Sequence, residues 1–236
     1  MAKAAQAALQ AQVVVFGFDP DPATAPGRAL NVLTVKGGLP TADVEKGEKV
    51  ADAAARAAAE AGIDLGRKRG LTLVGLHDDP GGSRSLTPWF MVTATFGELG
   101  GPGKWSSVGR GLRIDAAGSS ALKTATERLR SETRHVAGAA GLLGDVFTGD
   151  DLLRLHVALH GGPRSSERTF RRRVQELRDS GVLRPVRDTE VAALRLRHRR
   201  FRSPAGTGGR PPELLRYGGS GGEEEQLSGL RARRSA

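Results

Sequence analysis

Four short apolar runs in the first half of the chain predict β-strands. Residues 12–18 (QVVVFGF) are apolar and rich in β-branched side chains, and residues 30–35 form a second run that ends at Gly37-Gly38. Two more strands are predicted at 71–76 and 89–96. The segments between these runs are rich in Asp, Pro and Gly, so they predict turns and loops.

Two stretches of this half have helical character. Residues 44–61 are rich in Ala and Glu, and Gly62 is placed to end a helix there. Ser119 or Ser120 is placed to cap a second helix that continues to about residue 136. Strand, strand, helix, strand, strand is an α+β pattern, and the second helix is expected to connect two domains.

The second half predicts a helix, a short break, another helix and a ribbon. Thr148 is placed to cap a helix over 149–160, and Gly161-Gly162-Pro163 breaks it. A second helix is expected from Ser165 or Ser166 to Ser180. Strands are then expected at 182–186 and 191–203, with Gly206, Gly208 and Gly209 in a turn. This order is that of a winged helix-turn-helix.

The expected division is therefore a first domain over 1–137, a DNA-binding domain over 138–217 and a disordered tail over 218–236.

Helical geometry gives the second helix of this DNA-binding domain two unlike faces. Phe170, Val174 and Leu177 share one face and are expected to pack inward. The opposite face carries arginines and a glutamine, which suits a helix that enters the major groove, although a solvated surface helix has the same pattern. Its members are Arg168, Arg172 and Gln175, flanked by Arg171 and Arg173.

Charge strengthens the nucleic-acid interpretation. The net charge is +10, and residues 128–236 contribute +9 of it, from 22 basic and 13 acidic side chains. All 22 basic residues of this half are Arg, whose planar fork binds phosphate and guanine edges. A solvated surface in an arginine-rich proteome is the alternative.

The chain has no Cys, which excludes disulfides, thiolate metal sites and a cysteine nucleophile. It shows neither a signal peptide nor an apolar run of about 20 residues, so we expect a cytoplasmic protein and no membrane partner.

Residues 147–177 and 208–217 resemble the C-terminal winged helix of Nudix-related transcriptional regulators. The resemblance is carried by Phe147-Thr148, by the run Thr169-Phe170-Arg171-Arg172-Arg173 and by Gly209-Arg210-Pro211. It implies a Nudix-like α/β/α sandwich followed by the winged helix. The residues expected to contact DNA are Thr148, Arg164, Ser166, Arg168, Thr169, Arg171, Arg172, Gln175 and Arg210.

The same resemblance implies a transcriptional repressor that binds a palindromic double-stranded operator as a homodimer. Its first domain would sense an ADP-ribose or NAD-type effector, or another nucleotide. The loop HDDPGGSRSLTPWF at 77–90 resembles the family's segment between two strands, so the expected ligand-binding residues are Asp78, Asp79, Arg84 and Phe90. Trp89 or Phe90 would stack on a base, unless both belong to the core.

A Nudix hydrolase needs the pattern Gly-x5-Glu-x7-Arg-Glu-x2-Glu-Glu-x-Gly, which places several carboxylates around Mg²⁺. Aligned on Gly62-Ile63, this chain keeps only Glu60, with Ala59 before it, Ala55-Arg56 at the Arg-Glu pair and Gly47 at the early Glu. We expect Glu48 and Asp52 to share a helical face, which is too few carboxylates for a metal cluster. No catalytic residue, metal or cofactor is therefore expected.

Two other functions remain open. The chain could be a Nudix-type hydrolase of nucleoside-diphosphate-linked compounds with an accessory basic domain. It could instead be an interaction protein whose basic half binds RNA or an acidic partner without sequence specificity.

Two local features are interpreted as follows. His156 and His160 are expected to form a surface pair rather than a zinc site. Residues 194–202 are expected to form a basic wing strand rather than a solvated edge.

Overall fold

The computed structural model describes residues 9–65, 70–79, 85–97, 99–109, 111–161, 166–198, 201 and 211–218. The chain divides into two compact units. Unit 1 comprises the chain up to Gly17 together with Asn31–Arg128, and unit 2 comprises Phe18–Leu30 together with the chain from Leu129 onward. The segment Phe18–Leu30 thus belongs with the C-terminal half, although it connects two strands of the first sheet. A division at residue 137 in the linear sequence does not anticipate this grouping.

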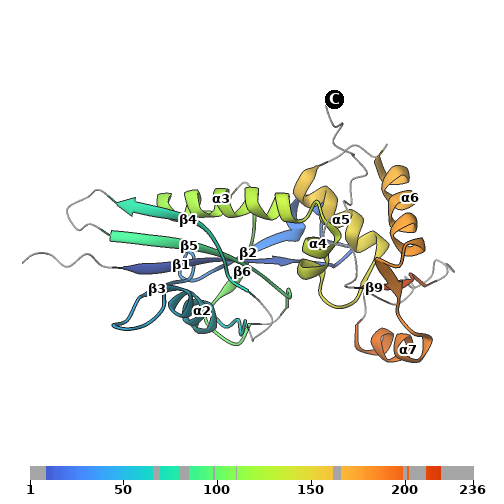
Figure 1. Ribbon diagram of the computed structural model, residues 1–236, viewed down its shortest axis with the longest axis horizontal. Coiled ribbons are helices and arrows are strands. Elements are labelled where there is room, and N and C mark those ends of the chain that lie inside the picture. Colours follow the sequence, from blue (N-terminus) through green and yellow to red (C-terminus); the bar gives the residue numbers. More distant parts are fainter. Residues whose placement is uncertain are drawn as a thin grey trace, which may run out of the picture. The chain divides into compact units, whose positions relative to one another are not determined.

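Unit 1 is built on a six-stranded sheet of order β4-β5-β1-β2-β6, in which β3 also pairs with β1 (Figure 1). β1 and β5 run parallel, whereas β4 with β5, β3 with β1 and β6 with β2 are antiparallel. The strands are Gln10–Phe18 (β1), Leu30–Thr34 (β2), Thr41–Asp43 (β3), Thr72–Asp79 (β4), Ser85–Ala94 (β5) and Lys104–Ser107 (β6).

Two helices cover the two faces of this sheet. Figure 1 shows α2 (Val50–Glu60) on one face and α3 (Ala116–Glu132) along the other. The face of α2 that meets the sheet consists of four buried alanines, and these pack on Val13, Val15, Phe90 and Val92. Because alanine side chains are small, the helix backbone lies close to the strands, which gives a compact core with few aromatic rings.

The observed elements confirm the four predicted strands of unit 1, shorten its first predicted helix and add two strands, β3 and β6. The helix expected over 44–61 begins at Val50, because β3 and a turn at Gly47 (φ 85°) precede it. The glycine-rich segment 97–111, for which no strand was predicted, contains β6. Gly62 ends α2 as predicted: its φ is 100°, and a Cβ there would lie 2.3 Å from the backbone nitrogen of Gly101.

Unit 2 contains five helices and a three-stranded antiparallel sheet of order β7-β9-β8 within the described residues. Val146, Val186, Phe201 and Leu214 form a buried cluster on this sheet. In the part of the chain that the structure describes, no helix is long and apolar enough to span a membrane. The elements are Pro26–Ala29 (α1), Val136–Leu143 (α4), Phe147–Thr148 (β7), Gly149–His160 (α5), Ser166–Asp179 (α6), Leu183–Pro185 (β8), Asp188–Arg197 (α7) and Leu214–Tyr217 (β9).

Two predictions of secondary structure in this half are wrong. The strand expected at 191–203 is instead α7, so 194–202 does not form a basic wing strand. Acidic side chains in the first turn of α7 and basic ones in its last turn favour the helix electrostatically. The helix expected to reach residue 136 ends at Glu132, and α4 follows as a separate helix. Gly138 of α4 lies so close to Glu132 that a Cβ would be 2.4 Å from its carbonyl oxygen.

α5 and α6 form the helix pair predicted from the sequence. Thr148 caps α5 in a reciprocal pair of hydrogen bonds: its hydroxyl accepts from the Asp151 amide (3.0 Å), and the Asp151 carboxylate accepts from the Thr148 amide (2.8 Å). Phe170, Val174 and Leu177 of α6 are all buried, which confirms their predicted inward orientation. Residues 162–165, which connect the two helices, lie outside the described residues, as does the tail beyond Gly218.

His156 and His160 lie within this helix pair, partly buried, so the expectation of a surface pair is wrong. The His156 ring is 4.9 Å from that of His160 and 5.1 Å from that of Phe170 on α6. Burial lowers the pKa of His156. Burial, together with the charges of His156, Arg134 and Arg130, lowers the pKa of His160 to about 4. Both imidazoles are therefore neutral near pH 7.

Arg154 on α5 fixes the segment Phe18–Leu30 to unit 2. Its guanidinium donates to the carbonyl oxygens of Pro20 (2.7 Å), Asp21 and Thr24 (2.7 Å). One planar group thereby orders three positions of a proline-rich loop. Arg154 has a structural role in unit 2, unlike the exposed arginines of α6.

We expect Thr148→Ala to lower the free energy of unfolding by about 1 kcal/mol, because the amide of Asp151 loses its acceptor. Urea denaturation measures this change. Thr148→Ser keeps the hydroxyl and should retain most of the stability, and Thr189→Ala at an exposed position of α7 should have little effect. Equal stability of Thr148→Ala and the unchanged protein would contradict the capping role.

We expect acid to destabilise the protein through His160. Its pKa is about 4 in the folded state against an ordinary value of 6.5 for histidine, so the unfolded chain takes up the proton first as the pH falls. The stability should therefore decrease between about pH 6.5 and 4. His160→Gln should make this decrease shallower, as measured by denaturant titrations at several pH values.

His198→Gln, at an exposed position, is the matched control and should keep the slope of the unchanged protein. Identical slopes for His160→Gln and His198→Gln would show that His160 does not contribute to the acid sensitivity.

Candidate functional site

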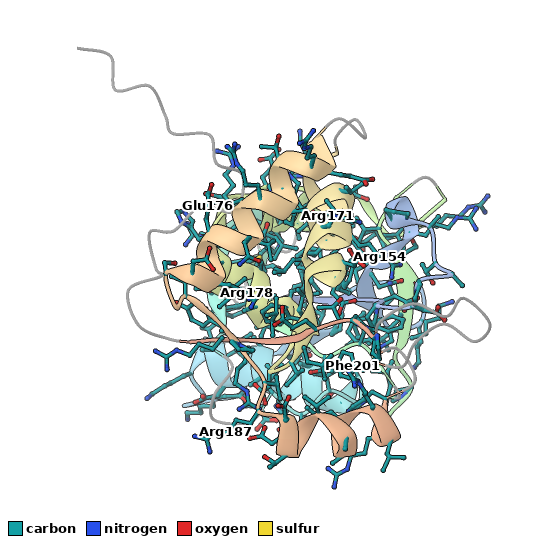
Figure 2. All side chains as sticks on the ribbon, turned by 90° about the vertical axis from the view of Figure 1, so that its right-hand side faces the viewer. Arg154, Arg171, Glu176, Arg178, Arg187 and Phe201 are labelled. Carbon is teal, nitrogen blue, oxygen red and sulfur yellow. The ribbon has the colours of Figure 1, made fainter. Side chains whose placement is uncertain are left out.

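The outward face of α6 is a surface of exposed polar and basic side chains. Arg168, Thr169, Arg171, Arg172 and Gln175 are all exposed on it. Figure 2 shows Arg171 and Arg178 toward opposite ends of this helix, with Glu176 between them. The face exists because the apolar residues of α6 recur at helical spacing on its other side, where they pack against unit 2.

Several arginines of this face make ion pairs. Arg171 lies 3.5 Å from the Asp150 carboxylate on α5, and Arg172 lies 3.5 Å from Glu176 one turn further along α6. The side chains of Arg171 and Arg172 are 66% and 78% exposed, so each pair contributes only about 0–1 kcal/mol in water. A phosphate or base edge can replace such partners at small cost. Arg168 has no partner among the described residues.

Charge is distributed unevenly along α6. Its first eight residues hold four arginines and one glutamate, whereas its last six hold one arginine and two carboxylates. The basic half coincides with the N-terminal end of the helix, where the backbone also carries partial positive charge. Recognition helices contact base edges and phosphates mainly with this end.

The other residues predicted to contact DNA are placed differently. Thr148 is 6% exposed and its hydroxyl is engaged in capping α5, so the structure gives it a structural role instead of a DNA contact. Ser166 begins α6, but its side chain is not described. Arg164 and Arg210 lie outside the described residues.

The helix α2 carries an ion-pair network that the sequence alignment did not anticipate. Arg56 donates to both carboxylate oxygens of Glu48 (3.2 and 2.9 Å), to Glu60 (3.4 Å) and to the carbonyl oxygen of Asp43 (2.8 Å). The hydrogen bond with Arg56 lowers the pKa of Glu48, and the same bond raises the pKa of Arg56. Glu48 precedes α2, so it does not share a helical face with Asp52 as expected.

Aligning the Nudix pattern on Arg56 instead of Gly62 would have predicted this ion-pair network. Seven residues lie between Glu48 and Arg56, and seven also lie between the early Glu and the Arg of the Nudix pattern. Glu60 is the fourth residue after Arg56, where the pattern has a glutamate. In this alignment Ala57 and Ala61 replace the other two glutamates. Among the described residues, no three His, Cys, Asp or Glu side chains are grouped so that they could hold a metal ion.

The residues predicted to bind a ligand are not gathered at one place. Phe90 lies in the core beneath α2, so its ring does not offer a stacking surface. Asp78 is exposed on β4 opposite Leu86, four residues along β5 from Phe90, or about 13 Å. Arg84 lies outside the described residues, and the side chain of Asp79 is not described. Trp89 points to the opposite face from Phe90 and stacks on His77 (5.8 Å between centroids, 12° between planes).

No family model matches the sequence, and no curated protein matches it either. Solved structures do resemble it. A MutT/nudix family protein from Enterococcus faecalis has a TM-score of 0.64 at 12% identity, covering 92% of this chain and 88% of that one.

NrtR from Shewanella oneidensis has a TM-score of 0.63 at 18% identity, covering 89% of this chain and 93% of that one. The same values hold for NrtR solved in complex with a 27mer DNA. At such low identities the likeness shows the fold alone. The chain thus has a mixed α/β fold like that of Nudix proteins.

Proposed function

We propose that this protein is a sequence-specific DNA-binding transcriptional regulator in which a Nudix-like unit senses a small nucleotide-type effector. The observation that carries the proposal is α6: its apolar side is buried by Phe170, Val174 and Leu177, and its opposite side is an exposed arginine face. An amphipathic helix with this arrangement suits the major groove of DNA.

Unit 2 would act as a winged helix. α5 and α6 are the two helices of the helix-turn-helix, and the sheet β7-β9-β8 packs with them. α7 is inserted between β8 and β9, where a simple wing has only a turn. The solved complex of NrtR with DNA supports DNA as the partner of this architecture.

In this proposal α6 supplies base and phosphate contacts through Arg168, Thr169, Arg171, Arg172 and Gln175. Further contacts near α6 come from Arg164, Ser166 and Arg210. Two such helices in a twofold homodimer would enter successive major grooves of a palindromic operator, about 34 Å apart. The protein would act in the cytoplasm as a repressor. Binding of an ADP-ribose or NAD-type effector to unit 1 would change the operator affinity by a population shift.

The proposal treats the chain as no longer catalytic. Alanines at 57 and 61 cannot bind a metal, and Arg56 engages Glu48 and Glu60. A second function has one observation in its favour, because the spacing of Glu48, Arg56 and Glu60 still matches the Nudix pattern. Hydrolysis of a nucleoside-diphosphate-linked compound is therefore the alternative.

We expect Arg172→Ala to weaken operator binding by roughly 1–3 kcal/mol, because a base or phosphate contact is lost. The operator can be obtained by selecting duplexes from a random library with the unchanged protein, and affinities follow from fluorescence anisotropy. Arg187→Ala is the matched control, since Arg187 is also exposed in unit 2 but lies at the start of α7 (Figure 2). Equal losses in both variants, or no enriched duplex, would contradict the recognition role of α6.

We expect no Mg²⁺-dependent turnover of ADP-ribose, because only Glu60 remains of the three glutamates that follow the Nudix arginine. Chromatographic detection of released AMP, in reactions with and without Mg²⁺, measures this turnover. Glu60→Gln is the control for contaminating activity. Turnover that requires Mg²⁺ and disappears in Glu60→Gln would establish the hydrolase instead.

A further inference from the structure

Two buried polar atoms on neighbouring strands of unit 1 have no hydrogen-bond partner among the residues that the structure describes. They are Gln12 Oε1 on β1 and Trp89 Nε1 on β5. Gln12 is 6% exposed and Trp89 is 7% exposed. The two residues are register partners in the parallel pairing of β1 with β5, so both side chains extend from the same face of the sheet. This is the face opposite to Phe90 and α2.

The orientation of the Gln12 amide is fixed by Thr41. The Thr41 hydroxyl donates its single hydrogen to the carbonyl oxygen of Leu39 (3.1 Å), so it can only accept from Gln12. Gln12 Nε2 therefore donates to Thr41 Oγ1 (3.3 Å). The unpartnered atom is consequently the amide oxygen, which is an acceptor.

The indole of Trp89 is fixed by β4. Gly75 is its register partner there, and a Cβ at Gly75 would lie 2.8 Å from Trp89 Cε3, so the ring occupies the space that any larger residue would need. His77 stacks on the same ring. Because Cε3 and Nε1 lie on opposite edges of an indole, the N–H group is turned away from β4. The unpartnered donor is thus held in place by its surroundings.

We propose that Gln12 and Trp89 form a recognition point for the effector, and this inference rests on the ligand-sensing role proposed for unit 1. The group that fits must donate to Gln12 Oε1 and accept from Trp89 Nε1. A sugar hydroxyl does both through one oxygen, and the amide or amidine edge of a base does so through adjacent atoms. A nucleoside carries both kinds of group. Each buried atom left without a partner is costly, so a ligand that satisfies both gains affinity.

The test measures binding of ADP-ribose, adenosine and ribose 5-phosphate to the full chain by calorimetry. Gln12→Leu removes the acceptor and Trp89→Phe removes the donor while keeping an aromatic ring. Each should weaken binding of the probes that carry the recognised group about tenfold or more. Ribose 5-phosphate and adenosine distinguish recognition of the sugar from recognition of the base.

The matched controls are Gln10→Leu and Trp105→Phe. Gln10 bonds to exposed Asp43, and Trp105 Nε1 donates to the carbonyl oxygen of Gly97. Neither control should change the affinity. Gln12→Leu should lower the unfolding free energy by no more than the loss of its one side-chain hydrogen bond to Thr41, because the oxygen that it also removes has no partner among the described residues.

Three outcomes would overturn the inference. If a buried water alone joins the two atoms, Gln12→Leu lowers the stability by more than the loss of the Thr41 hydrogen bond and leaves the affinity unchanged. If the unchanged protein binds a probe and both variants bind it equally, this recognition point is wrong and the sensing role stands. If the unchanged protein binds none of the three probes, effector sensing fails as well, and binding of the selected operator shows whether the regulator itself survives.

Discussion

The burial of one side of α6 is the constraint on which the candidate interface depends. Phe170, Val174 and Leu177 recur at helical spacing, and their removal from water fixes how α6 is rotated about its own axis. The rotation alone decides that Arg168, Arg171 and Arg172 are exposed. The ring of His156 on α5 packs against Phe170 and so contributes to the same buried contact.

Arginine has three different roles in this chain, and its partners decide which one applies. On α6 the guanidinium groups lie on the surface with weak, exposed ion partners, which leaves them available to phosphate or bases. Arg154 donates to three backbone carbonyls and orders a loop. Arg56 binds two glutamates at the helix that would hold the metal in a Nudix hydrolase. The large excess of arginine therefore does not by itself locate a nucleic-acid surface.

The sheet of unit 1 separates two chemically different faces. Beneath α2, alanines and β-branched residues form an apolar core that includes Phe90. The other face, next to α3, carries Gln12, Thr41 and Trp89, and a buried acceptor and a buried donor there have no partner within the described ranges. Trp89 and Phe90 are neighbours in sequence, but their environments differ because successive residues of a strand point to opposite faces.

The sequence by itself determined the features that depend on neighbours within a few residues. These include the cap at Thr148, the end of α2 at Gly62, the inward side of α6 and four strands of the first half, β1, β2, β4 and β5. Tertiary structure decided the rest. The alternating Leu and Arg of 194–197 fit either a strand or a helix, and packing around Phe201 is compatible with α7. The partners of Arg154 and the shared face of Gln12 and Trp89 depend on strand register and on contacts between distant segments, which local periodicity does not encode.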